Sequence, residues 1–190
     1  MKIGLLYEGH LDQESLQIII KRIIGETGKD PESVIFVPYP ASGSIDGYIR
    51  LAAILFYDTH SCDLGVFVAD TDGQDSKRRR IKQAVARHCR NINASANFVV
   101  GFPDPELEQW FLDEEDAIKN NFSLEGNRRL PYADMPSKER FKKIVSEKRQ
   151  DITITISEYY AKVAVSVNLG KLYRSSDSFR SFYNAIKRAI

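Results

Sequence analysis

Residues 66–73, Val-Phe-Val-Ala-Asp-Thr-Asp-Gly, constrain the fold of this chain more than any other stretch. Successive apolar residues leave no polar side, which is typical of a strand buried on both faces of a parallel sheet. Such strands end where ligands bind, and this one ends in Asp70 and Asp72. Carboxylates two residues apart in an extended chain point to the same side, so both could face one ion. A tight turn that uses Gly73 explains the same residues equally well.

Short apolar runs alternate with helical patterns through the first half of the chain. The runs are residues 3–7, 34–37, 64–69 and 97–101, and the helical stripes occupy 12–25, 45–57 and the stretch from Ser76. Pro38 and Pro40 are expected to end the second run. The alternation predicts an α/β fold of the Rossmann-like kind, a central, mostly parallel sheet flanked by helices. Right-handed crossovers bring the carboxyl ends of such strands to one edge, so the polar residues that follow them should meet there.

The pattern changes after residue 101, where helices without strands are expected. Asp104 suits the N-cap of a helix that begins at Pro105, and further helices are predicted over 137–148, 156–167 and from 176 or 177. Alternating isoleucines at 152, 154 and 156 also fit a strand, but a helix is favoured from 156. The sequence thus predicts an α/β domain over 1–115 and a helical C-terminal extension over 116–190, packed together as one compact unit.

The overall composition excludes few functions. The 190 residues carry a net charge of +1, so any affinity for nucleic acid would have to come from a local patch. Two cysteines make no disulfide framework, and no apolar run reaches the length of a membrane span. The first residues lead into a strand pattern rather than a signal peptide. We therefore expect a cytoplasmic protein without a membrane partner.

Acidic residues follow two of the predicted strands. Glu8 and Asp12 leave the first strand, as Asp70 and Asp72 leave the third. Carboxylates gathered at one sheet edge repel each other unless a positive charge lies among them, and Mg²⁺ or Mn²⁺ would be a suitable cofactor. Asp12 is equally suited to be the N-cap of the next helix. His10 is either an exposed loop histidine, which we favour, or a contact to substrate.

Three further acids lie near the start of the helix after residue 101. Acidic side chains in the first turn of a helix are stabilised by its dipole. For Asp104, Glu106 and Glu108 as a group, this role in the helix is favoured over a role in metal binding. Glu106 is the first additional candidate for a metal ligand, because it lies away from the apolar face that carries Leu107 and Trp110.

Two basic segments are candidates for phosphate binding. The first, at the start of the predicted third helix, is Lys77, Arg78, Arg79 and Arg80. Cations at the start of a helix interact unfavourably with its dipole, and a bound phosphate would stabilise them. A solvated face neutralised by Asp75 is slightly favoured as the explanation. The second segment, 137–148, is also interpreted as a solvated face, since glutamates dilute its lysines.

The acidic motifs resemble those of a known family. Glu-Gly-x-x-Asp at Glu8 to Asp12 and Asp-x-Asp-Gly from Asp70 are similar to the motifs of the Toprim domain, over about the first 110 residues. The pairing of Glu8 with Asp12 is most similar to the overcoming-lysogenisation-defect nucleases. Residues 103–110 resemble a group of small, stand-alone bacterial Toprim-like proteins. The resemblance implies that Glu8 is a metal ligand or general acid/base, and that Asp12, Asp70 and Asp72 bind the metal.

Together these observations favour a Mg²⁺-dependent phosphodiesterase, a nuclease of the Toprim type. The resemblance implies a role in phage defence or as a toxin, with nucleic acid as the partner. It also implies a second protein partner, either another copy of the chain or an ATPase subunit. Two alternatives stay open, because a fold does not fix a function. One is a binding or regulatory module without catalysis, and the other is a hydrolase of a small phosphorylated molecule.

Overall fold

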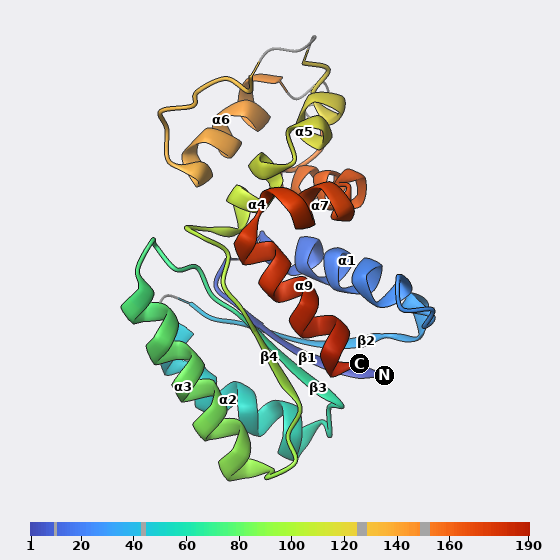
Figure 1. The fold of residues 1–190 in the computed structure, drawn as a ribbon, viewed down its shortest axis with the longest axis vertical. Coiled ribbons are helices and arrows are strands. Elements are labelled where there is room, and N and C mark those ends of the chain that lie inside the picture. The colour runs from blue at the N-terminus through green and yellow to red at the C-terminus, as the bar shows by residue number, and fades with distance from the viewer. Residues whose placement is uncertain (10, 43–44, 125–128, 149–152) are drawn as a thin grey trace.

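The computed structural model describes residues 1–9, 11–42, 45–124, 129–148 and 153–190. Its centre is a four-stranded, all-parallel sheet with the strand order β2-β1-β3-β4, flanked by helices (Figure 1). The strands are β1 (Lys2–Tyr7), β2 (Ile35–Pro40), β3 (Leu64–Val68) and β4 (Phe98–Gly101). The predicted α/β class is confirmed.

The strand order reverses direction at β1. The chain passes from β1 to β2 on one side and then crosses to β3 on the other side of β1. Connections that leave two neighbouring strands in opposite directions open a crevice at their carboxyl ends, where α/β proteins bind ligands. The crevice expected here lies between the ends of β1 and β3, which carry Glu8 and Asp70.

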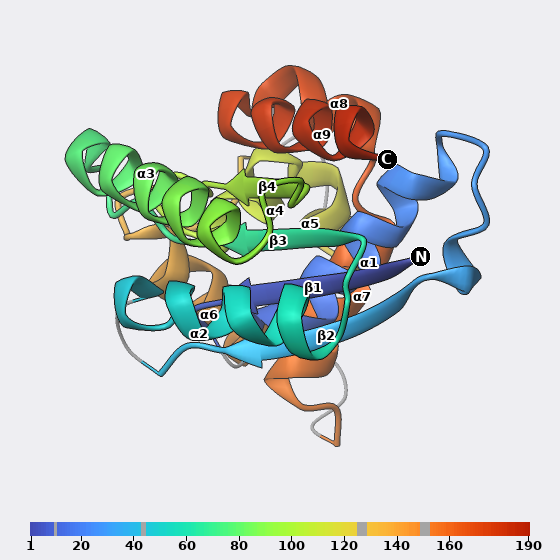
Figure 2. The same cartoon turned by 90° about the horizontal axis from the view of Figure 1, so that it is seen from below.

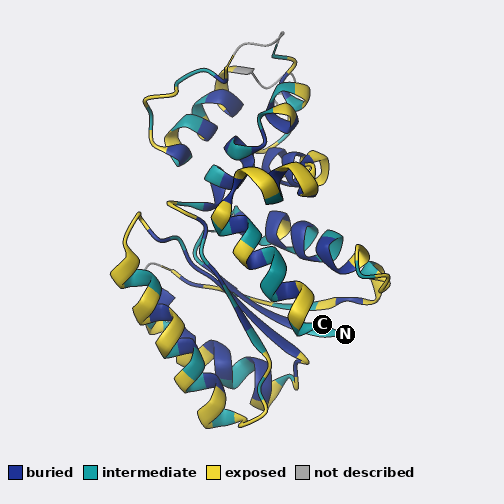
Figure 3. Ribbon diagram, viewed as in Figure 1, coloured by how far each residue is buried: buried dark blue, intermediate teal, exposed yellow. Residues whose placement is uncertain are grey.

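Helices cover both faces of the sheet. Helix α1 (Asp12–Gly25) and helix α9 (Asp177–Ala189) lie on one face, while α2 (Ile49–Ala53) and α3 (Asp75–Ile92) lie on the other (Figure 2). Successive side chains of a strand point to opposite faces, so Leu5 packs with the α1 side and Leu6 with the α2 side. Both faces are therefore buried (Figure 3), and the polar strand ends remain at the edge.

The second and third connections differ in detail from the prediction. The helix expected over 45–57 is a 3₁₀ turn (Ile45–Gly47), then α2, then a π-helical segment (Ile54–Thr59). This segment presses Phe56 against β1, where a Cβ on Gly4 would collide with the ring. Strand β2 does not stop before its prolines, because Pro38 and Pro40 pair with Leu5 and Tyr7 of β1 within the strand.

The C-terminal half forms a helical layer beyond the carboxyl ends of the strands (Figure 1). It contains α4 (Leu107–Asp113), α5 (Glu115–Asn121), α6 (Ser137–Lys148), α7 (Ile156–Ser166) and α8 (Leu169–Ser175). The helix favoured from residue 156 is confirmed. Helix α9 then returns to the sheet, where Phe182 stacks on Trp110 and packs against Gly101 of β4. The α/β layers are thus completed by residues beyond 115.

Three predicted helix caps are wrong. Helix α1 has Leu11 at its N-cap position, so Asp12 is not the cap. Helix α3 begins at Asp75 after Gln74, so Ser76 lies within it. Helix α4 has Glu106 at its N-cap position, because the preceding Asp104 side chain is bonded to Thr71 instead. No helix within the described ranges combines the length and apolarity that crossing a membrane requires.

Candidate acidic site at the carboxyl ends of the strands

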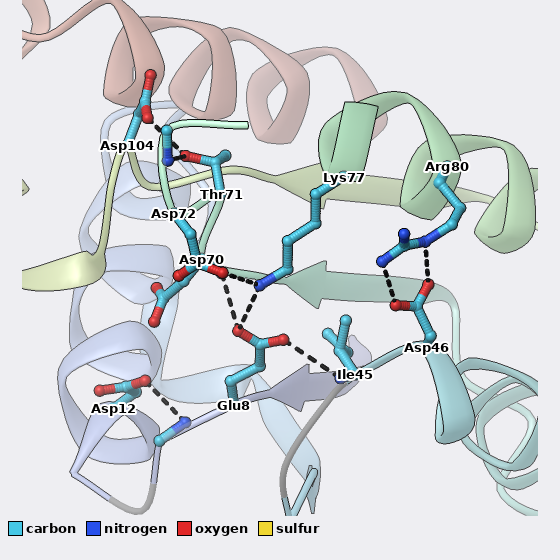
Figure 4. A network of polar contacts seen from close by, with 12 residues as sticks. Glu8, Asp12, Ile45, Asp46, Asp70, Thr71, Asp72, Lys77, Arg80 and Asp104 are labelled. Carbon is cyan, nitrogen blue, oxygen red and sulfur yellow. Dashed lines mark hydrogen bonds and ion pairs between the residues drawn. The ribbon is translucent and has the colours of Figure 1, made fainter. Parts of the chain in front are cut away.

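Glu8 joins the turns that follow β1, β2 and β3. Its Oε1 accepts the backbone N–H of Ile45 at 3.2 Å, and its Oε2 accepts the N–H of Asp70 at 3.2 Å (Figure 4). Lys77 Nζ lies 3.7 Å from the same Oε2. These contacts fix the Glu8 carboxylate at the expected crevice and tie the backbone of Asp70 to it.

Asp12 turns back from the first residue of α1 toward the loop after β1. Its Oδ2 accepts the N–H of Gly9 at 2.9 Å. A Cβ on Gly9 would lie 2.5 Å from that oxygen, so glycine permits the close approach. Burial raises the pKa of Asp12 to about 7, with a further contribution from Glu108, although the Gly9 hydrogen bond and Lys138 oppose the change.

Asp70 is the least satisfied carboxylate of the site. No hydrogen bond or ion pair reaches its side-chain oxygens from any described residue. Burial raises its pKa to about 8, and the charges of Asp12, Glu8 and Glu108 add to the increase. At neutral pH the surroundings of Asp70 therefore favour the protonated carboxyl, and a nearby cation would stabilise the ionised form.

Glu108 reaches the same region from α4. It is 3% exposed, and its Oε1 accepts the hydroxyl of Tyr160 from α7 at 2.6 Å. Burial and the Glu108 charge raise the pKa of Tyr160, so the phenol stays a donor. We call Asp12, Asp70 and Glu108 the inner carboxylates: Asp12 and Glu108 are buried, Asp70 is partly buried, and none forms an ion pair with the described residues.

Lys138 is the site residue that the sequence analysis assigned to a solvated face. It stands in the first turn of α6, where its ammonium lies near the inner carboxylates. Burial alone would lower its pKa, but Glu108, Asp70, Glu106 and Asp12 together raise it. The N-terminal turn of α6 is also bound by Glu106, whose Oε2 accepts from Ser137 Oγ and from the Lys138 N–H, each at 3.1 Å. Glu106 thus positions Lys138.

Asp72 lies outside the inner group. Strand β3 ends at Val68, and Asp72 adopts a left-handed backbone with φ of 51°, so the geometry of an extended chain does not apply to Asp70 and Asp72. The Asp72 side chain is 53% exposed and accepts from Lys77 Nζ at 2.9 Å. The turn explanation is confirmed, since Asp72 and Gly73 both have positive φ, whereas a metal bound by Asp70 stays a prediction.

The other cations of the basic run are paired with carboxylates or exposed. Arg78 Nη2 donates to Asp104 Oδ2 at 3.2 Å, and Asp104 Oδ1 accepts from Thr71 Oγ1 at 2.5 Å. Arg80 binds Asp46 through two hydrogen bonds of 3.2 and 2.8 Å, and Arg79 is exposed. We call Asp46, Asp72 and Asp104 the outer carboxylates. Each has a basic side chain from α3 as its partner. Figure 4 shows the pairs that Asp72 forms with Lys77 and Asp46 with Arg80.

The positions of the predicted residues divide into three groups. Glu8, Asp12, Asp70 and Glu108 gather at the carboxyl ends of β1 and β3 together with Lys138, which the sequence pattern did not indicate. Asp72 and Asp104 lie at the rim. His10 is outside the described residues. Across the described ranges, no three histidine, cysteine or acidic side chains are close enough together to hold a metal ion as they stand.

Comparison with known proteins adds no identification. No protein-family model, curated protein or solved structure matches the chain. The resemblance to Toprim domains stays a prediction from the two acidic motifs.

Proposed function

We propose that this protein is a Mg²⁺- or Mn²⁺-dependent phosphodiesterase that acts on nucleic acid. The observation that carries the proposal is the group of inner carboxylates near the carboxyl ends of β1 and β3, where burial and mutual repulsion raise the pKa of Asp12 and Asp70. Buried like charges without ion pairs cost stability, and proteins retain such groups where their chemistry is used.

The donor chemistry fits a hard divalent cation. Asp70 has both side-chain oxygens without a partner among the described residues, while Asp12 and Glu108 each accept a single hydrogen bond. Carboxylate oxygens are the ligands that Mg²⁺ and Mn²⁺ prefer. Since the side chains are not grouped tightly enough to hold an ion as they stand, binding would require them to move together.

The proposed roles follow from where each residue is held. Asp12, Asp70 and Glu108 would hold the cation, which when bound would polarise a phosphodiester and lower the pKa of an attacking water. Glu8 fixes the Asp70 turn through the N–H of Asp70 and the turn after β2 through the N–H of Ile45. Lys138, placed by Glu106, would contact a substrate phosphate once a metal neutralises the carboxylates that now surround its ammonium.

The direct test is cleavage of labelled single- and double-stranded DNA and RNA with Mg²⁺, Mn²⁺ or EDTA. We expect metal-dependent cleavage that falls by about a thousandfold or more in Asp70→Asn, because one ligand and its charge are lost. Asp46→Asn is the matched control, since it makes the same chemical change at an outer carboxylate, and it should cleave like the wild type. Cleavage that persists in EDTA or in Asp70→Asn would contradict the assigned site.

A binding module without catalysis is the second candidate. Two observations favour it: Lys138 already supplies a positive charge beside the inner carboxylates, and no metal-holding group is preformed among the described residues. In that case no nucleic acid would be cleaved with either metal, and Mg²⁺ would not change the stability. Turnover of a small phosphate ester without cleavage of any nucleic acid would instead support a small-molecule hydrolase.

A further inference from the structure

A groove runs along the free edge of β4, between α3 and α9. Its volume is about 620 Å³, and Phe98, Val100 and Phe102 lie along its floor. Helix α3 contributes Arg78 and Lys82 to one wall, and α9 contributes Asp177, Ser181 and Arg188 to the other. Figure 1 shows the two helices on either side of β4, which is the last strand of the sheet.

The outer edge of β4 presents backbone groups to this groove. The carbonyls of Asn97 and Gly101 accept from β3, so alternate residues 97, 99 and 101 face the neighbouring strand. Phe98, Val100 and Phe102 must then direct their N–H and C=O groups outward, since backbone groups alternate along a strand. Within the described parts of the chain, no strand pairs with this edge.

The opposite edge of the sheet is built differently. In β2 the N–H groups of Ile35 and Ala41 bond to β1, so the outward positions are 36, 38 and 40. Pro38 and Pro40 occupy two of these three positions and offer no N–H to a further strand. Prolines of this kind protect an edge from pairing. The β4 edge has no such protection, and its three outward positions keep their donors.

The charges of the groove select the kind of strand that fits. Arg78 is paired with Asp104, and Asp177 is paired with Arg180. Lys82 and Arg188 are exposed on the two walls and form no ion pair with any residue in the described ranges. The walls therefore carry unpaired positive charge above an apolar floor, which complements an extended segment that alternates acidic and apolar side chains.

We propose that the β4 edge is a docking site for an extended acidic peptide segment of a partner protein, which adds to the sheet as a fifth strand. Backbone hydrogen bonds to Phe98, Val100 and Phe102 would supply affinity, and Lys82 and Arg188 would select acidic side chains. This inference does not depend on a metal at the acidic site.

Two other occupants fit the groove less well. A second copy would bring its own Lys82 and Arg188 against the same walls, so like charges would face each other. A nucleic-acid strand would use the cations but cannot match alternating N–H and C=O groups at the spacing of a strand.

The probe for this site is a fluorescent, capped peptide of alternating valine and glutamate, added to the full-length chain. We expect saturable binding and at least a tenfold slowing of hydrogen exchange at the Phe98, Val100 and Phe102 amides, because these become hydrogen-bonded. The Val99 and Gly101 amides, already in the ladder, should not change. A peptide with lysine for glutamate, or one N-methylated at alternate residues, should bind at least about tenfold more weakly.

Two variants complete the test. Val100→Pro removes an outward donor, as the prolines of β2 do, and should abolish binding. Lys82→Glu with Arg188→Glu changes only exposed side chains, so it should fold normally and weaken binding at least about fivefold. Absence of binding at about 1 mM peptide would overturn the proposal. It would also be overturned by a dimer of the chain that Val100→Pro dissociates, or by an oligonucleotide that protects the same amides.

Discussion

The inner and outer carboxylates lie at the same edge of one sheet and differ in whether a basic side chain is paired with them. Asp46, Asp72 and Asp104 are each paired with Arg80, Lys77 or Arg78 and remain partly exposed. Asp12 and Glu108 are buried, Asp70 is partly buried, and none of the three has an ion pair with the described residues. The outer carboxylates are therefore each neutralised by an ion pair, whereas the three inner ones have only the ammonium of Lys138 nearby and no ion pair among the described residues.

The difference shows that acidic sequence motifs do not by themselves identify a metal site. Asp70 and Asp72 belong to one motif, yet the first is partly buried without an ion pair and the second is exposed and paired with Lys77. What separates them is desolvation: an exposed carboxylate is hydrated and screened, while a buried one must gain a cation or a proton. If desolvation is what matters, only the inner carboxylates should respond to pH and to Mg²⁺.

The largest expected effect is a loss of stability as pH rises in the absence of metal. A carboxyl whose folded pKa is raised binds its proton more tightly in the folded state, so folding favours the protonated form. In the folded protein the pKa of Asp12 is about 7 and that of Asp70 is about 8, both above the ordinary carboxyl range. Stability is therefore lost as the pH rises from that ordinary range to about 8. We expect the free energy of unfolding to fall by about 3–6 kcal/mol from pH 5 to pH 8.

Urea unfolding at a series of pH values with EDTA measures this effect directly. Repeating the series with Mg²⁺ should recover much of the loss at high pH, because a cation bound to the ionised carboxylates stabilises the folded state. Stability that rises toward pH 8 in EDTA would contradict the raised pKa values.

Asp70→Asn should stabilise the protein at high pH. Asparagine cannot ionise, so the variant loses the repulsion with Asp12, Glu8 and Glu108. We expect a gain of about 2–4 kcal/mol at pH 8 in EDTA, little change at pH 5, and no further gain from Mg²⁺. Thermal and urea unfolding at both pH values would show this. A destabilised Asp70→Asn at pH 8 would mean that its carboxylate is satisfied in the wild type.

Removal of the Lys138 ammonium should have the opposite sign and a smaller size. Lys138→Met takes away a half-buried cation near the inner carboxylates, so their ionised forms become less stable. We expect a loss of about 1 kcal/mol at pH 8, less at pH 5, and a larger stabilisation by Mg²⁺ than in the wild type. Lys142→Met, at an exposed position of the same helix, is the matched control. Equal losses in both variants would assign Lys138 to the solvated face after all.

Sequence patterns predicted the part of this site that local chain geometry determines. Glu8 and Asp70 were found because each follows an apolar strand, and parallel strands end at one edge. Lys138 was not predicted as a site residue, because its position depends on a long connection after α5 that returns α6 to the sheet edge. Glu108 shows an intermediate case. An acid near the start of a helix was explained by the helix dipole. Its burial becomes apparent only in the structure, where the Tyr160 hydroxyl donates to it.

The fold shows the same division. The strands and the alternation of helices follow from periodicity, and the all-parallel sheet confirms them. The prolines of β2 were expected to end a strand, since proline lacks an N–H, but that donor is not needed on the outward side of an edge strand. Which side is outward depends on strand order, and strand order is a property of the whole chain.

The smallest expected effect belongs to the outer carboxylates. Asp46→Asn removes the ionic partner of Arg80, whose guanidinium is more than half exposed. Exposed pairs gain little because water hydrates the separated charges and salt screens the remaining attraction. We therefore expect no measurable shift of the unfolding midpoint at physiological salt, at pH 5 or at pH 8, and an unchanged response to Mg²⁺. If Asp46→Asn instead altered the Mg²⁺ response as Asp70→Asn does, the division into inner and outer carboxylates would fail, because desolvation would no longer distinguish the residues that bind the metal.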